Sequence, residues 1–193
     1  KALELLFQMQ AEGIAWTPRA CSAALRACGE AGLMDRAVQL TGKMRQSGVN
    51  PSDDDYVVLI RMCVPRRGRA YNRSNRGGSS RVLELLQHME DTDHAPKLPH
   101  FNEAIMACGR AGDTAIVSQI LQEMHRKGVR PNIITWNARL DALGGAGLID
   151  QMLATYKKMQ AARQRPNIYT ITCMLSRVGS AGERQIAEDL GRI

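Results

Sequence analysis

Residues 128–159 read GVRPNIITWNARLDALGGAGLIDQMLATYKKM, and parts of this stretch return at fixed distances along the chain. Its Ala-Gly dipeptide at 146–147 has copies at 111–112 and 181–182, each 35 residues away, and an earlier copy at 31–32. The methionine that ends the stretch recurs at steps of 35, 45, 35 and 35 residues, as Met9, Met44, Met89, Met124 and Met159. A period of this size indicates a repeat protein, in which each unit covers the apolar face of the next.

One repeat, residues 133–167, contains two helical patterns. Thr135 is the expected N-cap of a first helix, in which Trp136, Leu140 and Leu143 share one face. The glycine-rich run GGAG at 144–147 interrupts this pattern and predicts a tight turn. A second apolar stripe follows from 149 to 159, and Pro166 comes after it. Each repeat is therefore predicted to be a pair of antiparallel helices.

The fold class predicted from this period is all-α, a right-handed superhelical solenoid of antiparallel helix-turn-helix repeats. Full repeats are expected at 18–52, 53–97, 98–132 and 133–167, between the C-terminal part of a repeat at 1–17 and a partial repeat at 168–193. The repeat at 53–97 is longer by ten residues and holds an insertion near 65–81. Since both ends of the chain fall inside a repeat, we expect it to be a fragment of a longer array.

The cysteines and the apolar residues exclude several classes of protein. Cys28, Cys63 and Cys108 follow the repeat spacing, so we expect them to be packing residues in a reducing compartment. The sequence has five cysteines and no C-x-x-C motif, which argues against a disulfide scaffold and a zinc site. The sequence contains no run of 18 apolar residues, so it predicts no membrane-spanning helix.

The basic character of the chain comes from one segment, PRRGRAYNRSNRGGSSR at 65–81. The net charge is +7, and this segment supplies six positive charges and no acid: Arg66, Arg67, Arg69, Arg73, Arg76 and Arg81. A solvated, flexible surface loop is one interpretation. We favour a second, in which these arginines bind RNA phosphates without sequence preference.

Two mostly polar positions also recur with the repeat. The first lies in the first helix of each repeat, at Ser22, Val57, Asn102, Asn137 and Thr172. The second comes immediately after the proline that ends each repeat, at Ser52, Lys97, Asn132 and Asn167, and is preceded by Thr17, which follows Trp16. Helix capping explains any single polar residue there. Recurrence at both positions favours a binding surface formed by the first helices.

The stretch at 128–159, together with GVNPS, KMRQSG and EMHRKG, resembles pentatricopeptide repeats over nearly the whole chain. Tetratricopeptide repeats have 34 residues and a different Trp and Leu-Gly pattern. The resemblance implies modular binding of single-stranded RNA, with one base read per repeat by a residue of the first helix and a residue that closes the repeat. We call these two residues a reading pair.

The resemblance implies reading pairs Asn102–Asn132 and Asn137–Asn167, a combination similar to pyrimidine readers of the family. Ser22–Ser52 forms a pair without an assigned preference, and Thr17 and Thr172 each stand without a partner in the sequence. Residues expected to flank the bases are Arg19, Pro99, Ile134 and Tyr169. The repeat at 53–97 departs from the pattern with Val57 and Lys97, and is predicted to read no base.

Three consecutive acids, Asp53, Asp54 and Asp55, precede the pattern of a first helix. We expect a solvated helix N-terminus, where carboxylates interact favourably with the helix dipole. A metal site formed with Asp91, Asp93 and His94 is a less favoured alternative, because the spacing matches no known metal-binding loop.

The leading hypothesis is a binder of single-stranded RNA, either mRNA or rRNA, in a mitochondrion or chloroplast, acting in transcript stabilisation, processing or translation. No catalytic motif, cofactor, metal site or membrane partner is predicted. The alternative is a structural subunit of a large organellar ribonucleoprotein such as a ribosome, which contacts rRNA and protein subunits without reading bases. Peptide binding is a third possibility, supported only by the architecture.

Overall fold

The computed structural model describes residues 6, 8–9, 12–64, 77–91 and 94–180. Helices are the only regular secondary structure in these ranges, so the expected all-α class of helical repeats is confirmed. The chain forms two compact units, Lys1–Pro96 and Lys97–Ile193, which we describe separately.

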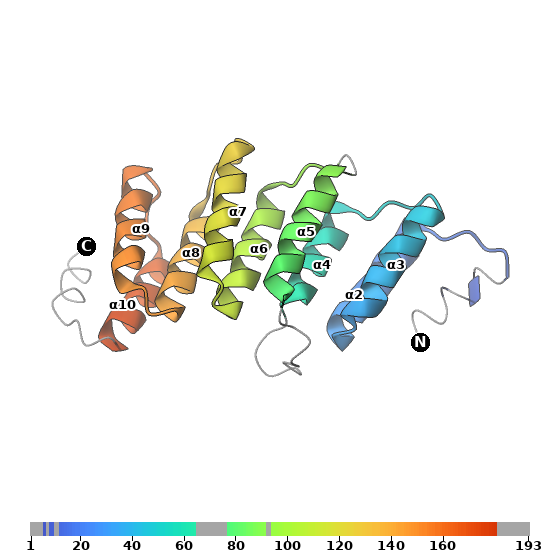
Figure 1. Ribbon diagram of the computed structural model, residues 1–193, viewed down its shortest axis with the longest axis horizontal. Helices are drawn as coiled ribbons and strands as arrows, with labels where there is room; N and C mark the ends of the chain where they lie inside the picture. Colours follow the sequence, from blue (N-terminus) through green and yellow to red (C-terminus); the bar gives the residue numbers. More distant parts are fainter. Residues whose placement is uncertain (1–5, 7, 10–11, 65–76, 92–93, 181–193) are drawn as a thin grey trace. The chain divides into compact units, whose positions relative to one another are not determined.

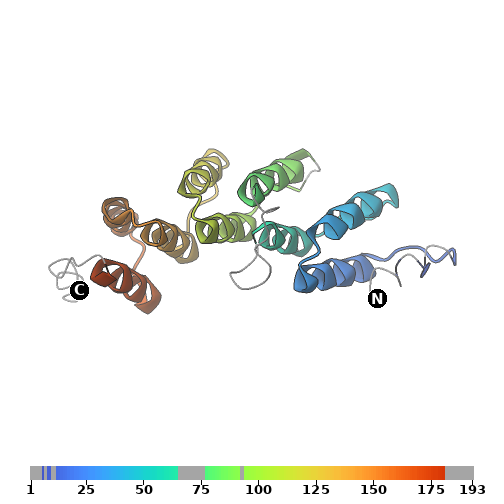
Figure 2. The ribbon, with the colours of Figure 1, turned by 60° about the horizontal axis from the view of Figure 1, so that its bottom comes forward.

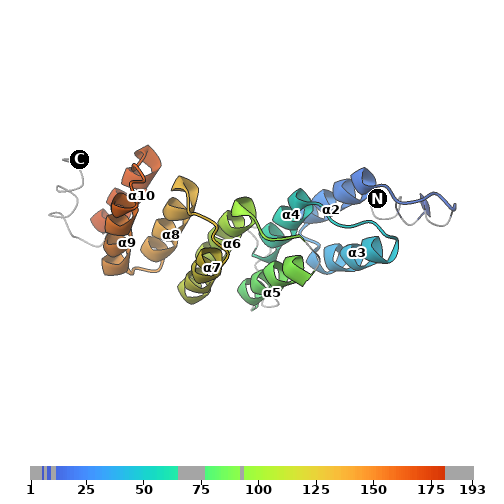
Figure 3. The same ribbon diagram turned by 90° about the horizontal axis from the view of Figure 1, so that it is seen from above.

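The first unit contains α2 (Pro18–Ala31), α3 (Met34–Gln46), α4 (Asp53–Cys63) and α5 (Gly78–Asp91) (Figure 1). Helix α2 packs against α3 and α4, and α4 packs against α5. Seen from above, α2 and α4 form one layer and α3 and α5 the other (Figure 3). The first helices of these two repeats therefore lie side by side.

The second unit contains α6 (Leu98–Ala111), α7 (Thr114–Arg126), α8 (Ile133–Gly145), α9 (Ile149–Ala161) and α10 (Ile168–Ser180). Helix α8 contacts α6, α7, α9 and α10. Figure 2 shows α6, α8 and α10 in one row and α7 and α9 in the other. Residues at equivalent positions of α6, α8 and α10 are thus placed in series.

Local signals in the sequence determine where the helices begin and end. Helix α2 begins at Pro18, whose fixed φ suits the first helical position, and the Thr17 Oγ1 accepts a hydrogen bond from the Ala20 amide over 3.3 Å. Gly32 ends α2 and Gly112 ends α6, with φ of +69° and +82°. Glycine adopts this left-handed conformation without a steric penalty.

The repeating methionines and cysteines form the core. Four methionines of this series are fully buried, since Met44, Met89, Met124 and Met159 have 0% exposure, whereas Met9 is half-buried. Cys28, Cys63 and Cys108 are buried thiols at equivalent helix positions, which confirms their expected role in packing. The methionines and cysteines that recur in helices α2 to α9 are therefore core residues.

Glycine permits close approach between successive first helices. A Cβ atom placed on Gly109 of α6 would lie 2.8 Å from the Cβ of Ala142 on α8. A Cβ on Gly144 would lie 2.7 Å from the Arg177 Cγ of α10. The prediction of a turn throughout 144–147 is therefore wrong: Gly144 and Gly145 belong to α8, and only Gly147 has the positive φ of a turn, +73°. Helix packing, rather than chain reversal, explains Gly144.

Candidate nucleic-acid interface

Asn102 and Asn132, the two members of a predicted reading pair, lie in contact. The Asn102 Nδ2 on α6 donates to the Asn132 Oδ1, immediately before α8, over 3.4 Å. Thr135, in the first turn of α8, links both residues. Its hydroxyl accepts from the Asn132 backbone N–H at 3.1 Å and donates to the Asn102 Oδ1 at 2.6 Å. Three side chains from two repeats thus form one network.

The helix cap determines which way each amide points. The Asn132 side chain accepts from the Thr135 backbone N–H at 3.1 Å, so the accepting atom is the amide oxygen. The Asn102 group that faces this oxygen must then be its NH₂ group, and the Asn102 oxygen accepts the Thr135 hydroxyl proton. The backbone therefore fixes the orientation of the whole pair.

The same network recurs one repeat later. The Asn137 Nδ2 on α8 donates to the Asn167 Oδ1 over 3.3 Å, and the Thr170 hydroxyl donates to the Asn137 Oδ1 at 2.7 Å. The Thr170 backbone N–H donates to the Asn167 Oδ1 at 2.9 Å, which fixes the amides as before. Two repeats of the same unit hold their reading pairs in one geometry.

Each pair leaves hydrogen-bond donors available. Asn102 and Asn137 are only 6% and 8% exposed, whereas Asn132 is half-buried and Asn167 is exposed. Within the described residues, no hydrogen bond uses the Nδ2 of Asn132 or Asn167. The more exposed residue of each pair, Asn132 or Asn167, thus has both of its amide hydrogens available. The side of the pair that a ligand can reach is therefore rich in hydrogen-bond donors.

The residue immediately before a first helix can cap the helix and still bind a ligand. Ser52, Asn132 and Asn167 each accept a backbone N–H of the following helix through a side-chain oxygen. Thr135 was expected as the N-cap of α8, and this is wrong: Asn132 is the cap and Thr135 lies at the third helical residue. An asparagine caps with its oxygen and retains its NH₂ group for a ligand, because the two groups lie on opposite sides of the amide.

We call Thr135 and Thr170, each of which bonds to both members of a pair, linking residues. In the first unit, the linking residue of the Ser22–Ser52 pair is Asp55. The Ser22 hydroxyl on α2 donates to the Asp55 Oδ2 at 2.9 Å, and the Ser52 hydroxyl donates to the same oxygen at 2.8 Å. The Ser52 backbone N–H also donates to it at 2.9 Å. Asp55 therefore occupies the place that Thr135 and Thr170 occupy in the second unit.

This arrangement corrects the expected role of the three acids. Asp54 is exposed and Asp53 half-buried at the start of α4, but Asp55 is only 3% exposed. A solvated helix end does not describe Asp55, because its carboxylate is bonded to the reading pair in the interior. No group of three metal-ligating side chains occurs among the described residues, and Asp93 lies outside them.

Sequence reasoning missed the linking residues, although a signal was present. The third residue of each first helix from α4 onward is polar, at Asp55, His100, Thr135 and Thr170, with the repeat spacing of 45, 35 and 35. His100 is 1% exposed, and its Nδ1 accepts from the Lys97 backbone N–H at 3.0 Å. A third recurring polar position therefore accompanied the two that define the reading pairs.

The other predicted positions are at helix starts and are mostly exposed. All four residues expected to flank bases are exposed: Arg19, Pro99, Ile134 and Tyr169. Ile134 and Tyr169 are 49% and 55% exposed, and other large apolar side chains among the described residues, such as Ile168 and Val38, are exposed as well. Thr17 and Thr172 are exposed as well, on α2's cap and on α10. Val57 is half-buried on α4, and Lys97 is exposed before α6.

The arginine insertion is only partly described. Arg66, Arg67, Arg69, Arg73 and Arg76 lie outside the described residues. Arg81 is exposed in the first turn of α5, so residues 78–81 belong to a helix and not to a loop. The first residue of this helix is Gly78. A glycine is needed at this position because a Cβ atom there would collide with the Cys63 carbonyl oxygen.

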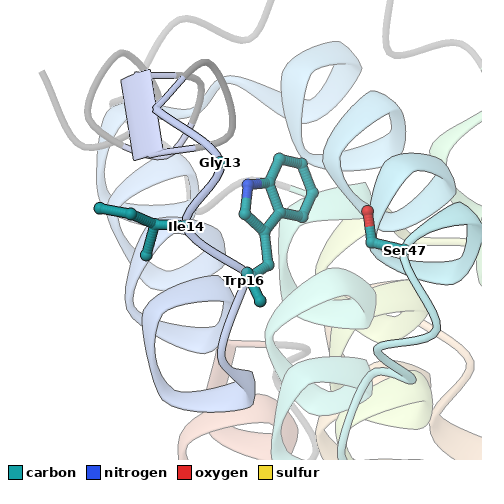
Figure 4. A pocket seen from close by; sticks show the side chains of 5 residues that line it. Gly13, Ile14, Trp16 and Ser47 are labelled. Atoms are coloured by element: carbon teal, nitrogen blue, oxygen red, sulfur yellow. The ribbon is translucent and has the colours of Figure 1, made fainter.

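Three further observations concern other kinds of site. A hollow of about 300 Å³ is lined by Gly13, Ile14, Ala15, Trp16 and Ser47, none of which belongs to a predicted reading pair (Figure 4). Burial and the Asp141 carboxylate raise the pKa of the Cys173 thiol to about 11, which opposes nucleophilic chemistry at this sulfur. None of the described helices has the length and apolar character to span a bilayer.

Comparison with known protein families assigns the chain to one of them. A pentatricopeptide repeat domain profile matches residues 4–66 and 84–146, and a PPR repeat family profile matches residues 131–178. The first match covers more than half of the chain, which therefore belongs to the pentatricopeptide repeat family. No curated protein sequence matches the chain significantly.

Solved structures of this family are similar to the chain. The pentatricopeptide repeat protein PPR10 from maize has 27% identity and a TM-score of 0.77, over 97% of this chain and 25% of that one. PPR10 in complex with an 18-nt psaJ RNA element has 23% identity and a TM-score of 0.69, over 93% and 28%. The PPR domain of Arabidopsis thaliana protein-only RNase P 1, in complex with tRNA, has 16% identity and a TM-score of 0.67, over 91% and 87%. The chain thus spans about a quarter of the PPR10 chain.

Proposed function

We propose that the chain binds single-stranded RNA and that Asn102–Asn132 and Asn137–Asn167 read two adjacent pyrimidines. The observation that supports this most is the repeated amide network, in which each pair has the same fixed orientation and the same available donors. Similarity to PPR10, which is solved with a psaJ RNA element, supports RNA as the ligand. An available NH₂ group suits the O2 carbonyl that uracil and cytosine share.

In this proposal the exposed apolar residues serve the same surface. Ile134 and Tyr169 stand in the first turns of α8 and α10, close in sequence to the linking residues Thr135 and Thr170. A flat base that leaves solution needs an apolar or aromatic partner for its faces. We assign these two side chains to the faces of the bases and the amides to their edges.

The proposal includes no reaction catalysed by the repeats. The comparison with protein-only RNase P concerns its PPR domain, which is solved with tRNA. We place the protein in a mitochondrion or chloroplast, acting in stabilisation, processing or translation of a transcript. This placement rests on the resemblance to the family, and microscopy of the tagged parent protein tests it.

Asn132→Asp is the sharpest test of base reading. The aspartate keeps the cap to the Thr135 N–H and the acceptor for the Asn102 NH₂ group with one oxygen, and replaces the available NH₂ group with a second oxygen. We expect binding of strands that present a carbonyl there to weaken about 10-fold, because one hydrogen bond is replaced by repulsion between acceptors. Binding of short uridine and cytidine strands, measured by fluorescence anisotropy, gives this change.

A control separates the charge from the position. Asn50→Asp introduces the same charge at an exposed residue outside the reading pairs, and is expected to weaken all strands equally and slightly. If Asn132→Asp behaves like Asn50→Asp, the pair does not read a base. That result favours the alternative of a structural subunit that contacts RNA without base preference.

A further inference from the structure

We propose that Asp55 makes the Ser22–Ser52 pair selective for guanine. This inference rests on the proposed function, because it assigns a base to a repeat of the first unit in the way that the proposed function assigns bases to repeats of the second unit. The sequence of the pair alone indicates no preference, since a hydroxyl group donates and accepts equally well. The buried carboxylate between the two hydroxyls removes that ambiguity.

Both hydroxyl protons are committed to Asp55. The Ser22 Oγ and the Ser52 Oγ lie 2.9 Å and 2.8 Å from the same oxygen, Asp55 Oδ2. An ionised carboxylate has no proton to give, so each hydroxyl must be the donor in its contact. Each serine has one proton, and neither can donate to a base while this arrangement holds.

The pair is therefore left with acceptors only. The Ser52 Oγ accepts from the Asp55 backbone N–H at 3.3 Å and keeps one lone pair. The Ser22 Oγ accepts from no group within the described residues and keeps both. Ser22 is half-buried and Ser52 exposed, so both oxygens lie nearer to solvent than the carboxylate that orients them. The Ser22–Ser52 pair therefore offers acceptors to a ligand, whereas the two asparagine pairs offer donors.

The two units differ because their linking residues differ. A threonine hydroxyl such as that of Thr135 has one proton, which it gives to one member of the pair. The Asp55 carboxylate accepts a hydrogen bond from the hydroxyl of each serine of the pair. An acid at the third helical residue thus converts the pair into an acceptor, whereas threonine leaves the donors of the pair available.

Guanine is the base whose edge fits such a pair. Its Watson-Crick edge carries two adjacent donors, N1–H and N2–H₂, whereas adenine, cytosine and uracil each carry one donor there, next to an acceptor. An edge with acceptors alone satisfies both guanine donors and opposes an acceptor of the other three bases. The negative charge of Asp55, although it is indirect, acts in the same direction because it repels base acceptors.

The experiment uses the full chain and uridine strands that contain one central guanosine, adenosine or cytidine. The chain can choose its register on such a strand, so the position of the single base need not be known beforehand. We expect the guanosine strand to bind about 10-fold more tightly than the adenosine strand. Asp55→Thr, which introduces the linking residue of the second unit, should remove most of this difference.

Two further variants make the test specific. Asp55→Asn preserves size and keeps one side-chain oxygen, which can accept from both serine hydroxyls as Asp55 Oδ2 does, so it should retain most of the guanosine preference that Asp55→Thr loses. Asp54→Asn removes the same charge from an exposed neighbour in the same helical turn, and should leave the preference intact. Circular dichroism melts of all variants verify that they fold.

Two results would overturn the proposal. One is equal binding of the guanosine and adenosine strands by the wild-type chain, a measurement that requires no variant. The other is an equal loss of binding to every strand in Asp55→Thr, which would make Asp55 a purely structural link between α2 and α4. In either case the response of Asn132→Asp still tests base reading in the second unit separately, so the failure of this inference is distinguishable from that of the proposed function.

Discussion

The Thr170 hydroxyl donates to the Asn137 Oδ1 at 2.7 Å, although the two residues are 33 positions apart and belong to consecutive repeats. Thr170 has 0% exposure and lies in the first turn of α10. In the second unit, the threonine of one repeat thus orients the asparagine that the repeat before it contributes to a predicted reading pair. Two neighbouring repeats are consequently needed to build one reading pair.

Thr170→Val tests this dependence. Valine has nearly the shape of threonine, and it leaves the Asn137 Oδ1 and the Asn167 backbone N–H without their partner. We expect a loss of about 1–3 kcal/mol in the free energy of unfolding, as for a buried polar group that loses its hydrogen bond. Urea denaturation gives this loss, and base preference should weaken at the nucleotide of the Asn137 pair. Thr170→Ser, which retains the hydroxyl, should restore the preference.

The close approach of α6 and α8 predicts a cost for a single methyl group. Gly109→Ala should destabilise the chain by about 1–3 kcal/mol, because its Cβ would lie 2.8 Å from the Ala142 Cβ and both atoms are attached directly to helix backbones. Gly42→Ala in α3 is the matched control, since no atom lies within 4 Å of its Cβ. That change should stabilise by about 0.5–1 kcal/mol through helix propensity. Equal melting temperatures for the two variants would contradict this packing.

Thiol labelling tests the burial of the cysteines. Burial raises the pKa of Cys21 and Cys28, and burial together with Asp141 raises that of Cys173 to about 11. A group with a raised pKa stays protonated as the pH rises through its ordinary value, and the thiol form is the unreactive one. At pH 8 the native chain should react slowly with iodoacetamide, and mass spectrometry should detect fast alkylation only in denaturant. Fast labelling of Cys173 in the native chain would disagree with its position on α10.

Salt dependence tests the arginine insertion. Replacing Arg66, Arg67 and Arg69 by alanine should reduce the slope of log K against log salt by up to about one for each lost phosphate contact. Base preference should stay the same, because phosphate contacts carry no sequence information. An unchanged slope in this titration would assign the insertion to a protein partner instead of RNA.

The fold was predictable because the repeat spacing is a property of the sequence itself. The 35-residue step located Asn102, Asn132, Asn137 and Asn167, and the structure brings the members of each pair into contact. The linking residues were not predicted, because a contact across 33 residues depends on how one repeat stacks on the next.

Asp55 and Gly144 show why a single residue type is ambiguous in sequence. Asp55 looked like a solvated acid at a helix start, and it is buried because Ser22 of the preceding repeat approaches it. Gly144 looked like part of a turn, but it lies within α8. The close approach of α10 explains why this helical residue is a glycine. In both cases the deciding neighbour is one repeat away. Local propensity therefore loses to packing at these positions.

Selection from a random RNA pool tests the central claim most directly. The wild-type chain should enrich strands that share two adjacent pyrimidines, because two consecutive repeats carry the same asparagine network. The double variant Asn132→Asp and Asn167→Asp should enrich strands that differ at those two nucleotides and agree elsewhere. Identical base compositions in the two selected pools would contradict base reading by these residues.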